Sequence, residues 1–370
     1  MNNEDIYAAF GAVSDEDLAA CEKENKGRRR TLRGVAIGLA ACLAAVAVIP
    51  LAVKAVRNNG VIGGFHGENT DDVSETEEPL SRLVLAPIAP SGAENGITSF
   101  TLSPDAAISS ADSAMIWRAY PAAVPEELIE RLAEKLGMGD HEIKYDENGV
   151  PQTVTDGRGN SIFVLSESGT IACSASKENE AVHDPVELPS DDECIRIARE
   201  WIAGLGSLTE DYTTKAPLVG ENDFVTKQID GQAVRFPTIK TVTFMYKDLD
   251  ELEVNGVAPR IIVDISHDGE VISVMIIRRE FLEYRRYPVI TPEEAMKNIR
   301  NGVGAVYCTG ETGGEGIVTS VRLAYYNPEA AAESEYLYPV YIFEGKSGEG
   351  SFTAVTYAMP GEYYEEADIQ

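Results

Sequence analysis

Histidine is the first residue type to consider for catalysis, because an imidazole exchanges protons near neutral pH. The chain has 370 residues and four histidines, which are far apart in the sequence: His66, His141, His183 and His267. No two of them have the HExxH spacing that would bring both imidazoles onto one helix face to bind zinc. The histidines therefore predict neither a proton-transfer pair nor a metal site.

Two short motifs resemble enzyme or nucleotide sites, and each fails at a required position. Ser174 and Lys177 have the S-x-x-K spacing of penicillin-binding enzymes, but they end a strand-like run, and neither SDN nor KTG follows. GKSGEG begins at Gly345, but Val340 stands where a phosphate-binding loop needs its first glycine. We therefore interpret the protein as non-enzymatic, without a cofactor or a metal. An envelope hydrolase remains a third alternative, because paired catalytic carboxylates need no short motif.

The cysteines indicate neither a metal site nor a disulfide framework. Their five positions do not have the spacing of a zinc motif: Cys21, Cys42, Cys173, Cys194 and Cys308. Two interpretations of the last three remain open, namely one disulfide with a spare thiol, or small buried hydrophobic side chains. The second interpretation is favoured.

A run of twenty uncharged residues at 34–53 predicts a single transmembrane helix. At about 1.5 Å of rise per residue, it is as long as the roughly 30 Å of bilayer hydrocarbon. The basic residues that precede it outnumber those that follow it: Lys23, Lys26, Arg28, Arg29, Arg30 and Arg33 before, Lys54 and Arg57 after. This bias predicts a cytoplasmic N-terminus and an extracytoplasmic C-terminal part in the cell membrane. A cleaved signal peptide and lipidation at Cys42, the end of an LAAC tetrapeptide, are the alternatives.

Residues 1–33 form the predicted cytoplasmic segment, which has a short amphipathic pattern. Ile6, Phe10 and Val13 recur at the spacing of one helix face. The segment has room for two short amphipathic helices, and helices of this length cannot bury a core of their own. A cytoplasmic partner or the membrane surface must therefore cover their apolar faces. We therefore take these three residues as candidate partner-binding residues. The alternative is a frayed tail ahead of the anchor.

Acidic residues dominate the predicted extracytoplasmic part. The chain has a net charge of −30, and beyond Arg57 Asp and Glu outnumber Lys and Arg by more than two to one. This charge repels phosphate backbones and anionic lipid head groups, so we expect no nucleic-acid partner and no binding along the membrane surface. We interpret it as a solvated acidic surface, with a cation-binding surface as the alternative.

The extracytoplasmic part divides into a stalk and a folded region. Residues 58–96 are rich in Gly, Asn, Glu, Thr, Pro and Ser and predict a flexible stalk. Beyond it, short strand-like runs alternate with turn motifs and are interrupted by amphipathic helices, which predicts an α+β fold. We predict three repeats of one helix packed on an antiparallel sheet, at 97–178, 185–286 and 287–360.

The three predicted helices have clear starting signals. Pro125 suits the first turn of one helix. Ser190 with Glu193, and Thr291 with Glu294, have the spacing of a capping box. Each helix is followed by strand-like runs that DG, NG or EG turns separate, which is typical of antiparallel hairpins.

A tyrosine-rich run near the C-terminus is a further candidate partner site. The run has Tyr325, Tyr326, Tyr336, Tyr338 and Tyr341 at nearly strand spacing. We take Tyr325, Tyr326 and Tyr338 as candidate partner-binding residues, because tyrosine is common at the centre of protein interfaces. The alternative is alternating core and cross-strand packing.

The helix openings LPSDDECIRIA and YPVITPEEAM, each followed by a meander with DG or EG turns, resemble the PepSY and YycI-type ectodomains of Gram-positive, clostridial-type single-pass membrane proteins. The resemblance covers roughly residues 185–359. The layout is also similar to anti-sigma membrane proteins, although the zinc motif is missing: one cysteine and no histidine precede the anchor. These resemblances imply regulation or peptidase inhibition by binding, without catalytic residues.

The sequence therefore supports two hypotheses. The first is a non-enzymatic membrane-anchored regulator or sensor, whose ectodomain binds an envelope protein or ligand and signals through the anchor to a cytoplasmic regulator. The alternative is an extracytoplasmic binding or peptidase-inhibitor module with an inert cytoplasmic tail.

Overall fold

A computed structural model describes residues 79–88, 96–176, 182–229, 232–256, 259–327 and 335–367. The predicted cytoplasmic segment, the predicted transmembrane helix at 34–53 and most of the predicted stalk lie outside these residues. Within them, no helix is both long and apolar enough to cross a bilayer. The described chain has an α+β fold that is mostly sheet, with three α-helices.

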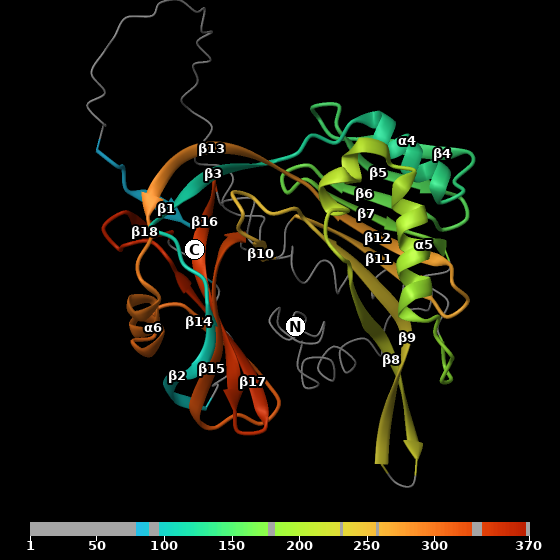
Figure 1. Ribbon diagram of the computed structural model, residues 1–370. Helices are drawn as coiled ribbons and strands as arrows, with labels where there is room; N and C mark the ends of the chain where they lie inside the picture. Colours follow the sequence, from blue (N-terminus) through green and yellow to red (C-terminus); the bar gives the residue numbers. More distant parts are fainter. Residues whose placement is uncertain are drawn as a thin grey trace, which may run out of the picture.

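The first large sheet is antiparallel and lies under two of the helices (Figure 1). Its strands, in spatial order, are β4 (His141–Tyr145), β5 (Pro151–Asp156), β6 (Ser161–Leu165), β7 (Thr170–Ser174), β12 (Val271–Ile277), β11 (Arg260–Ser266), β9 (Gln232–Met245) and β8 (Leu218–Ile229).

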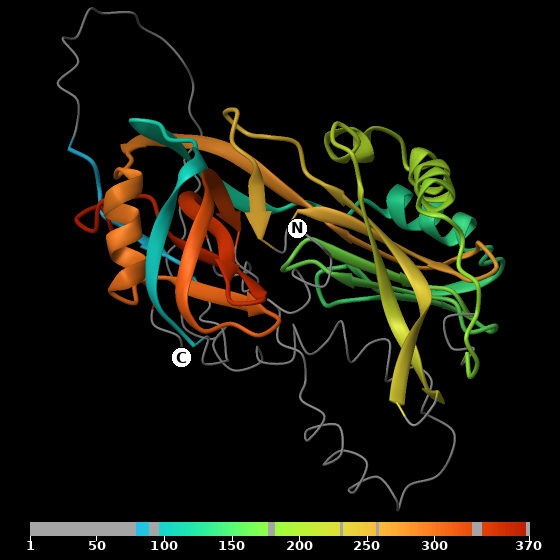
Figure 2. The same ribbon diagram turned by 60° about the horizontal axis from the view of Figure 1, so that its bottom comes forward.

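The second large sheet is mixed and strongly curved (Figure 2). Its main path is β10 (Val254–Gly256), β15 (Gly314–Asn327), β16 (Tyr336–Ser347), β17 (Gly350–Tyr357) and β14 (Ala305–Thr309). Three further strands join it: β2 (Ile97–Ile108) pairs with β15, while β3 (Ser113–Pro121) pairs with both β16 and β13 (Arg279–Pro288). A short parallel pair joins β1 (Leu83–Leu85) to β18 (Tyr364–Glu366).

The three predicted helices are confirmed as α4 (Glu126–Lys135), α5 (Asp191–Ala203) and α6 (Pro292–Arg300). A 3-10 helix, η3 (Gly206–Tyr212), follows α5. The N-cap of α6 is Thr291, which makes both bonds of the predicted capping box with Glu294. Ser190 caps α5 and accepts the Glu193 backbone N–H. Pro125 is the N-cap of α4 and lies one residue outside the helix.

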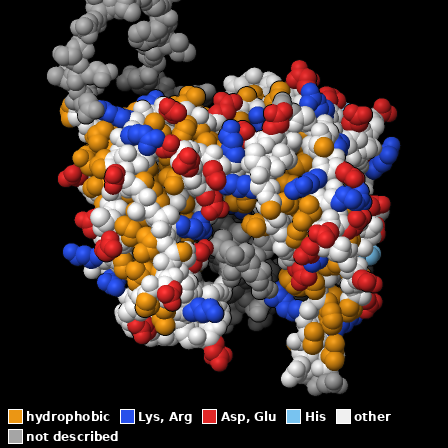
Figure 3. All heavy atoms as spheres, viewed as in Figure 1, with side chains coloured by type: hydrophobic (Ala, Val, Ile, Leu, Met, Phe, Trp, Pro, Cys, Tyr) orange, Lys and Arg blue, Asp and Glu red, His pale blue; other side chains and the backbone are white. Residues whose placement is uncertain are grey.

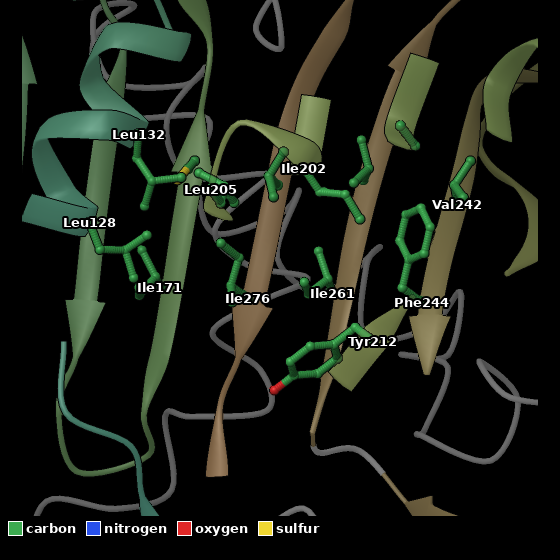
Figure 4. Packing of buried hydrophobic residues seen from close by; sticks show 14 of the residues in the cluster. Leu128, Leu132, Ile171, Ile202, Leu205, Tyr212, Val242, Phe244, Ile261 and Ile276 are labelled. Carbon is green, nitrogen blue, oxygen red and sulfur yellow. The ribbon is translucent and has the colours of Figure 1, made fainter. Parts of the chain in front are cut away.

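The core of the first sheet forms where α4 and α5 pack on one sheet face (Figure 4). Leu128 and Leu132 from α4 and Ile202 from α5 point toward the sheet, where Ile171 and Ile261 are fully buried. Burying each such side chain contributes about 1.5–3 kcal/mol relative to leaving it in water. The helix spacing read from the sequence therefore identifies this packing face.

The prediction of three repeats, each with its own sheet, is corrected by the strand pairing. β7 from the first predicted repeat pairs with β12 from the second, so both repeats contribute to one eight-stranded sheet. β2 and β3, also from the first repeat, instead pair with strands of the C-terminal part. Small meanders leave exposed strand edges, and pairing them into shared sheets removes those edges and enlarges each core.

The end of the predicted stalk is part of the folded core. Leu83 and Leu85 are 3% and 0% exposed and pack with Ile116 and Tyr287 in the core of the second sheet. β1 also pairs with β18, near the C-terminus. The boundary at residue 96 is therefore too late, because the apolar alternation Leu83, Leu85 is a short strand.

β3 and β13 connect the two large sheets. β13 begins two residues after β12 ends, and β3 leads through Pro121 into α4. The two strands pair antiparallel along their length, from Arg279 opposite Pro121 to Pro288 opposite Ser113. Both run across the top of the molecule in Figure 1. They therefore present one continuous outer surface between the sheets.

Candidate protein-binding surface

Exposed aromatic and basic side chains gather on one face of β3 and β13. Leu282 is 59% exposed, the largest exposed fraction among the described large hydrophobic residues, and Tyr120 is 39% exposed. Arg118 lies opposite Leu282 and, on its other side, opposite Tyr336 of β16. We define the tyrosine–arginine surface by its five residues: Arg118, Tyr120, Leu282, Tyr284 and Tyr336.

The side chains of this surface contact one another. The Arg118 guanidinium carbon lies 5.0 Å from the centroid of the Tyr284 ring, a cation–π distance. The centroids of the Tyr284 and Tyr336 rings are 5.5 Å apart. Interaction with the Tyr120 hydroxyl is the main reason that the pKa of Arg118 is raised, so its charge is permanent. Arg118 is therefore held between three phenol rings, although it is exposed.

The strand geometry explains why these residues share a face. A register shift between Glu283 and Arg285 marks a β-bulge at Tyr284. Tyr284 and Tyr336 are half-buried and pack against the core of the second sheet, while Tyr120 lies beyond the edge of that core. The surface is thus the outward continuation of a packed core, and its rings are supported from below.

The first described residues of the chain border this surface. The Ser81 hydroxyl lies 3.2 Å from the Tyr284 hydroxyl and 3.3 Å from the Tyr287 hydroxyl. Tyr287 also donates a hydrogen bond of 2.9 Å to the Ser81 carbonyl. Leu80 packs against the same core. The polypeptide that precedes Ser81 therefore enters the folded region next to Tyr284.

Figure 3 shows the chemical character of this region. Basic, acidic and hydrophobic side chains lie next to one another over the upper part of the view, where β3 and β13 cross between the sheets. Glu280, opposite Tyr120, contributes a negative charge to the same face. The surface is therefore mixed, with aromatic rings around one exposed guanidinium.

The predicted exposed patch of Tyr325, Tyr326 and Tyr338 is corrected by the structure. Tyr325 and Tyr338 are both 0% exposed, and Tyr326 is half-buried. Tyr325 packs edge-on against Trp117, whereas Tyr326 and Tyr338 meet on the opposite face with their ring centroids 6.1 Å apart. β15 and β16 are interior strands covered on both faces, so these tyrosines form core and cross-strand contacts.

Burial has a clear effect on these tyrosines. It raises the pKa of Tyr325 to about 12 and the pKa of Tyr338 well above its ordinary value. The Tyr338 hydroxyl donates a hydrogen bond of 2.6 Å to the Ala86 carbonyl. Ile6, Phe10 and Val13, the other candidate partner-binding residues, lie outside the described residues. Of the tyrosine run, only Tyr336 belongs to the tyrosine–arginine surface.

None of the five surface residues was among the predicted partner-binding residues, although Tyr336 lies in the tyrosine run and a local signal for the residues of β3 exists. Ile116, Arg118 and Tyr120 alternate at strand spacing, and Ile116 is 0% exposed. An apolar residue followed on the same face by Arg and Tyr indicates a strand that leaves the core and reaches solvent. The bulge at Tyr284 hides the matching alternation in β13.

Two other concave regions of the described chain have a different character. A cavity of about 240 Å³ lies against β14, β16 and β17 and is lined mainly by hydroxyl side chains, with Glu344 and Lys346. A shallow groove at the start of α5 includes His267 and Asp268. Among the described residues, no group of three or more His, Cys, Asp or Glu could hold a metal ion.

None of the three described cysteines forms a disulfide bond. Cys173 and Cys194 are buried, as the interpretation of small hydrophobic side chains predicts, and Cys308 is half-buried. Burial raises the pKa of the Cys173 thiol to about 12, which makes it a poor nucleophile.

Comparisons with known proteins give only low structural similarity. No family model matches the chain, and no curated protein matches it. An uncharacterized protein from Eubacterium rectale ATCC 33656 has a TM-score of 0.42 and 12% identity, over 74% of this chain and 90% of that chain. The YpeB C-terminal domain of Bacillus megaterium has a TM-score of 0.33 and 13% identity, over 65% and 94%. The YpeB domain is thus a weak structural neighbour.

Proposed function

We propose that this chain is a non-enzymatic binding protein whose tyrosine–arginine surface docks a partner polypeptide. The observation that carries the proposal is the clustering of an exposed arginine and an exposed leucine with three tyrosines across β3, β13 and the start of β16. Tyrosine and arginine are enriched among the residues that dominate binding free energy at protein interfaces.

Preorganisation supports the proposal further. Ordering a long side chain at an interface costs about 0.5–1.5 kcal/mol. Arg118 is already stacked over Tyr284, and Tyr284 and Tyr336 already pack on the core. Binding a partner would therefore cost little additional free energy for ordering these side chains.

The proposal includes the membrane layout. The anchor at 34–53 would hold the surface outside the cell, where the partner is an envelope protein, and residues 1–33 would engage a cytoplasmic regulator. The chain would then act as a membrane-anchored regulator or sensor. The alternative, a binding or peptidase-inhibitor module with an inert tail, needs only the extracytoplasmic surface, which lies wholly on described strands.

Photo-crosslinking in the native membrane tests the proposal. A benzophenone amino acid replaces Leu282 in one variant and Tyr145 in a control, because Tyr145 is similarly exposed, at 47%, but belongs to β4 of the other sheet. We expect one protein to be captured from position 282 and not from position 145. Capture of the same proteins from both positions would contradict the proposal.

A deletion separates the regulator from the inert-tail alternative. Removing Asn2–Glu24 deletes Ile6, Phe10 and Val13 but keeps the basic flank at Arg28–Arg30. If the protein relays a signal, the deletion abolishes crosslinks between the chain and a cytoplasmic protein, and it abolishes the regulatory activity. Capture of the envelope protein from position 282 persists. If the cytoplasmic tail is inert, the deletion leaves the regulatory activity unchanged.

A further inference from the structure

The chain itself has a segment that fits the tyrosine–arginine surface. We propose that the acidic segment Glu68–Glu78 docks on this surface in cis and competes with the partner. The inference rests on the proposed function, because it assumes that the surface binds polypeptide. It names the class of ligand as well, namely an extended acidic polypeptide.

The first support is the place where the segment joins the fold. Glu78 is three residues before Ser81, whose hydroxyl lies 3.2 Å from the Tyr284 hydroxyl. An extended chain spans at most about 3.3–3.6 Å per residue, so Glu75 can reach about 20 Å from Ser81. Arg118 lies much nearer, because its guanidinium carbon is 5.0 Å from the Tyr284 ring. The anchoring of β1 to β18 fixes this starting point.

The second support is charge complementarity. The segment reads ENTDDVSETEE and has six acidic residues and no basic residue. On a chain with a net charge of −30, β3 and β13 are unusual because they have four arginines and only two acidic residues: Arg118, Arg279, Arg285, Arg286, Glu280 and Glu283. Of these, Arg279 is only 5% exposed and Arg286 is paired with Asp250, and Arg118 is the exposed arginine of the tyrosine–arginine surface. The acidic segment is therefore joined to the fold next to an exposed arginine whose charge attracts it.

Tethering makes even a weak contact effective. A short linker gives a local concentration on the order of millimolar. If the segment binds with a dissociation constant equal to that concentration, the apparent dissociation constant of the partner rises about twofold, and a tenfold tighter contact raises it about elevenfold. Salt weakens the contact, because the Debye length falls from about 8 Å to about 3 Å between 0.15 M and 1 M.

The experiment uses the purified full chain in nanodiscs, with no other protein present. A benzophenone amino acid replaces Leu282, or Tyr145 in the control, and the crosslinked peptides are identified by mass spectrometry. The comparison variant removes the charge of the segment with E68Q, D71N, D72N, E75Q, E77Q and E78Q. We expect crosslinks from position 282 to residues 68–78, weaker at about 1 M salt, and lost in the neutralised variant. No crosslink to the segment, or equal crosslinks from position 145, would overturn the inference.

A second measurement keeps the inference separate from the proposed function. A fluorescent synthetic peptide of residues 67–78 is titrated into the wild-type and neutralised chains, and its anisotropy is followed. We expect binding to the neutralised chain to be at least about twofold tighter, because its surface is free, and to be lost when Arg118→Ala and Tyr336→Ala are added. If the peptide does not bind while an envelope protein is still captured at position 282, the cis contact is wrong and the proposed function stands.

Discussion

The substitution Tyr338→Phe tests whether this tyrosine belongs to the core or to a partner site. Tyr338 is 0% exposed and donates a hydrogen bond of 2.6 Å to the Ala86 carbonyl. The same carbonyl also accepts from the Tyr357 hydroxyl at 3.4 Å, so the substitution leaves it with one weak partner. Leaving a buried acceptor poorly satisfied costs about 1–3 kcal/mol, and the remaining contact places this case near 1–1.5 kcal/mol.

Thermal unfolding of the full chain in detergent measures this effect. For a folded region of this size, a loss of 1 kcal/mol lowers Tm by about 2–4 °C, so we expect a decrease of about 2–6 °C for Tyr338→Phe. The matched control is Tyr120→Phe, where the ring is 39% exposed, and where we expect a change within about 0.5 kcal/mol. An unchanged Tm for Tyr338→Phe, together with loss of partner capture at Leu282, would refute the assignment of Tyr338 to the core.

Three further predictions follow from local structure. Thr291→Ala removes the cap of α6 and should lower stability by about 1 kcal/mol, measured by urea unfolding against Thr98→Ala, whose hydroxyl bonds a strand carbonyl at an exposed site. Burial raises the pKa of Tyr325 and Tyr341 to about 12. Their contribution to stability is therefore complete below about pH 10 and declines above it as the pH approaches 12. The urea midpoint of unfolding should fall as the pH rises, and a constant midpoint up to pH 12 would contradict this prediction. In the folded chain, Cys173 should react with a thiol reagent far more slowly than Cys308, because Cys173 is buried and Cys308 is half-buried; equal rates before unfolding would contradict the described packing.

Local features of the fold could be predicted from the sequence because neighbouring residues determine them. The capping box at Thr291 and Glu294, the cap at Ser190 and the helix faces all depend on spacings of three or four residues. Hairpin turns such as HDG at His267 connect β11 to β12 and are similarly local. These signals require no knowledge of distant contacts.

The arrangement of the strands in sheets could not be predicted in this way. β7 pairs with β12 although about a hundred residues separate Cys173 from its partner Val274. Both strands have apolar alternation that fits several neighbours equally well, and the choice depends on how the two cores close. The three-repeat prediction failed at this point.

The burial of the tyrosine run was also beyond the sequence. Alternation correctly places Tyr325 and Tyr326 on opposite faces of β15. It does not show that both faces are covered, because the covering residues, among them Trp117 and Leu85, are distant in the sequence. Tyr325 and Tyr338 are therefore buried, whereas Tyr120 of β3 is exposed.

Partner capture from position 282 in chains with an altered surface tests the central proposal most directly. A benzophenone amino acid at Leu282 is combined with Tyr120→Ala and Tyr336→Ala, or with Tyr145→Ala as the control, in the native membrane. Truncating two interface tyrosines should cost about 2 kcal/mol or more of binding free energy, so we expect capture to fall at least tenfold in a chain that is still folded at the assay temperature. Undiminished capture in the double variant would contradict the proposal that this surface binds the partner.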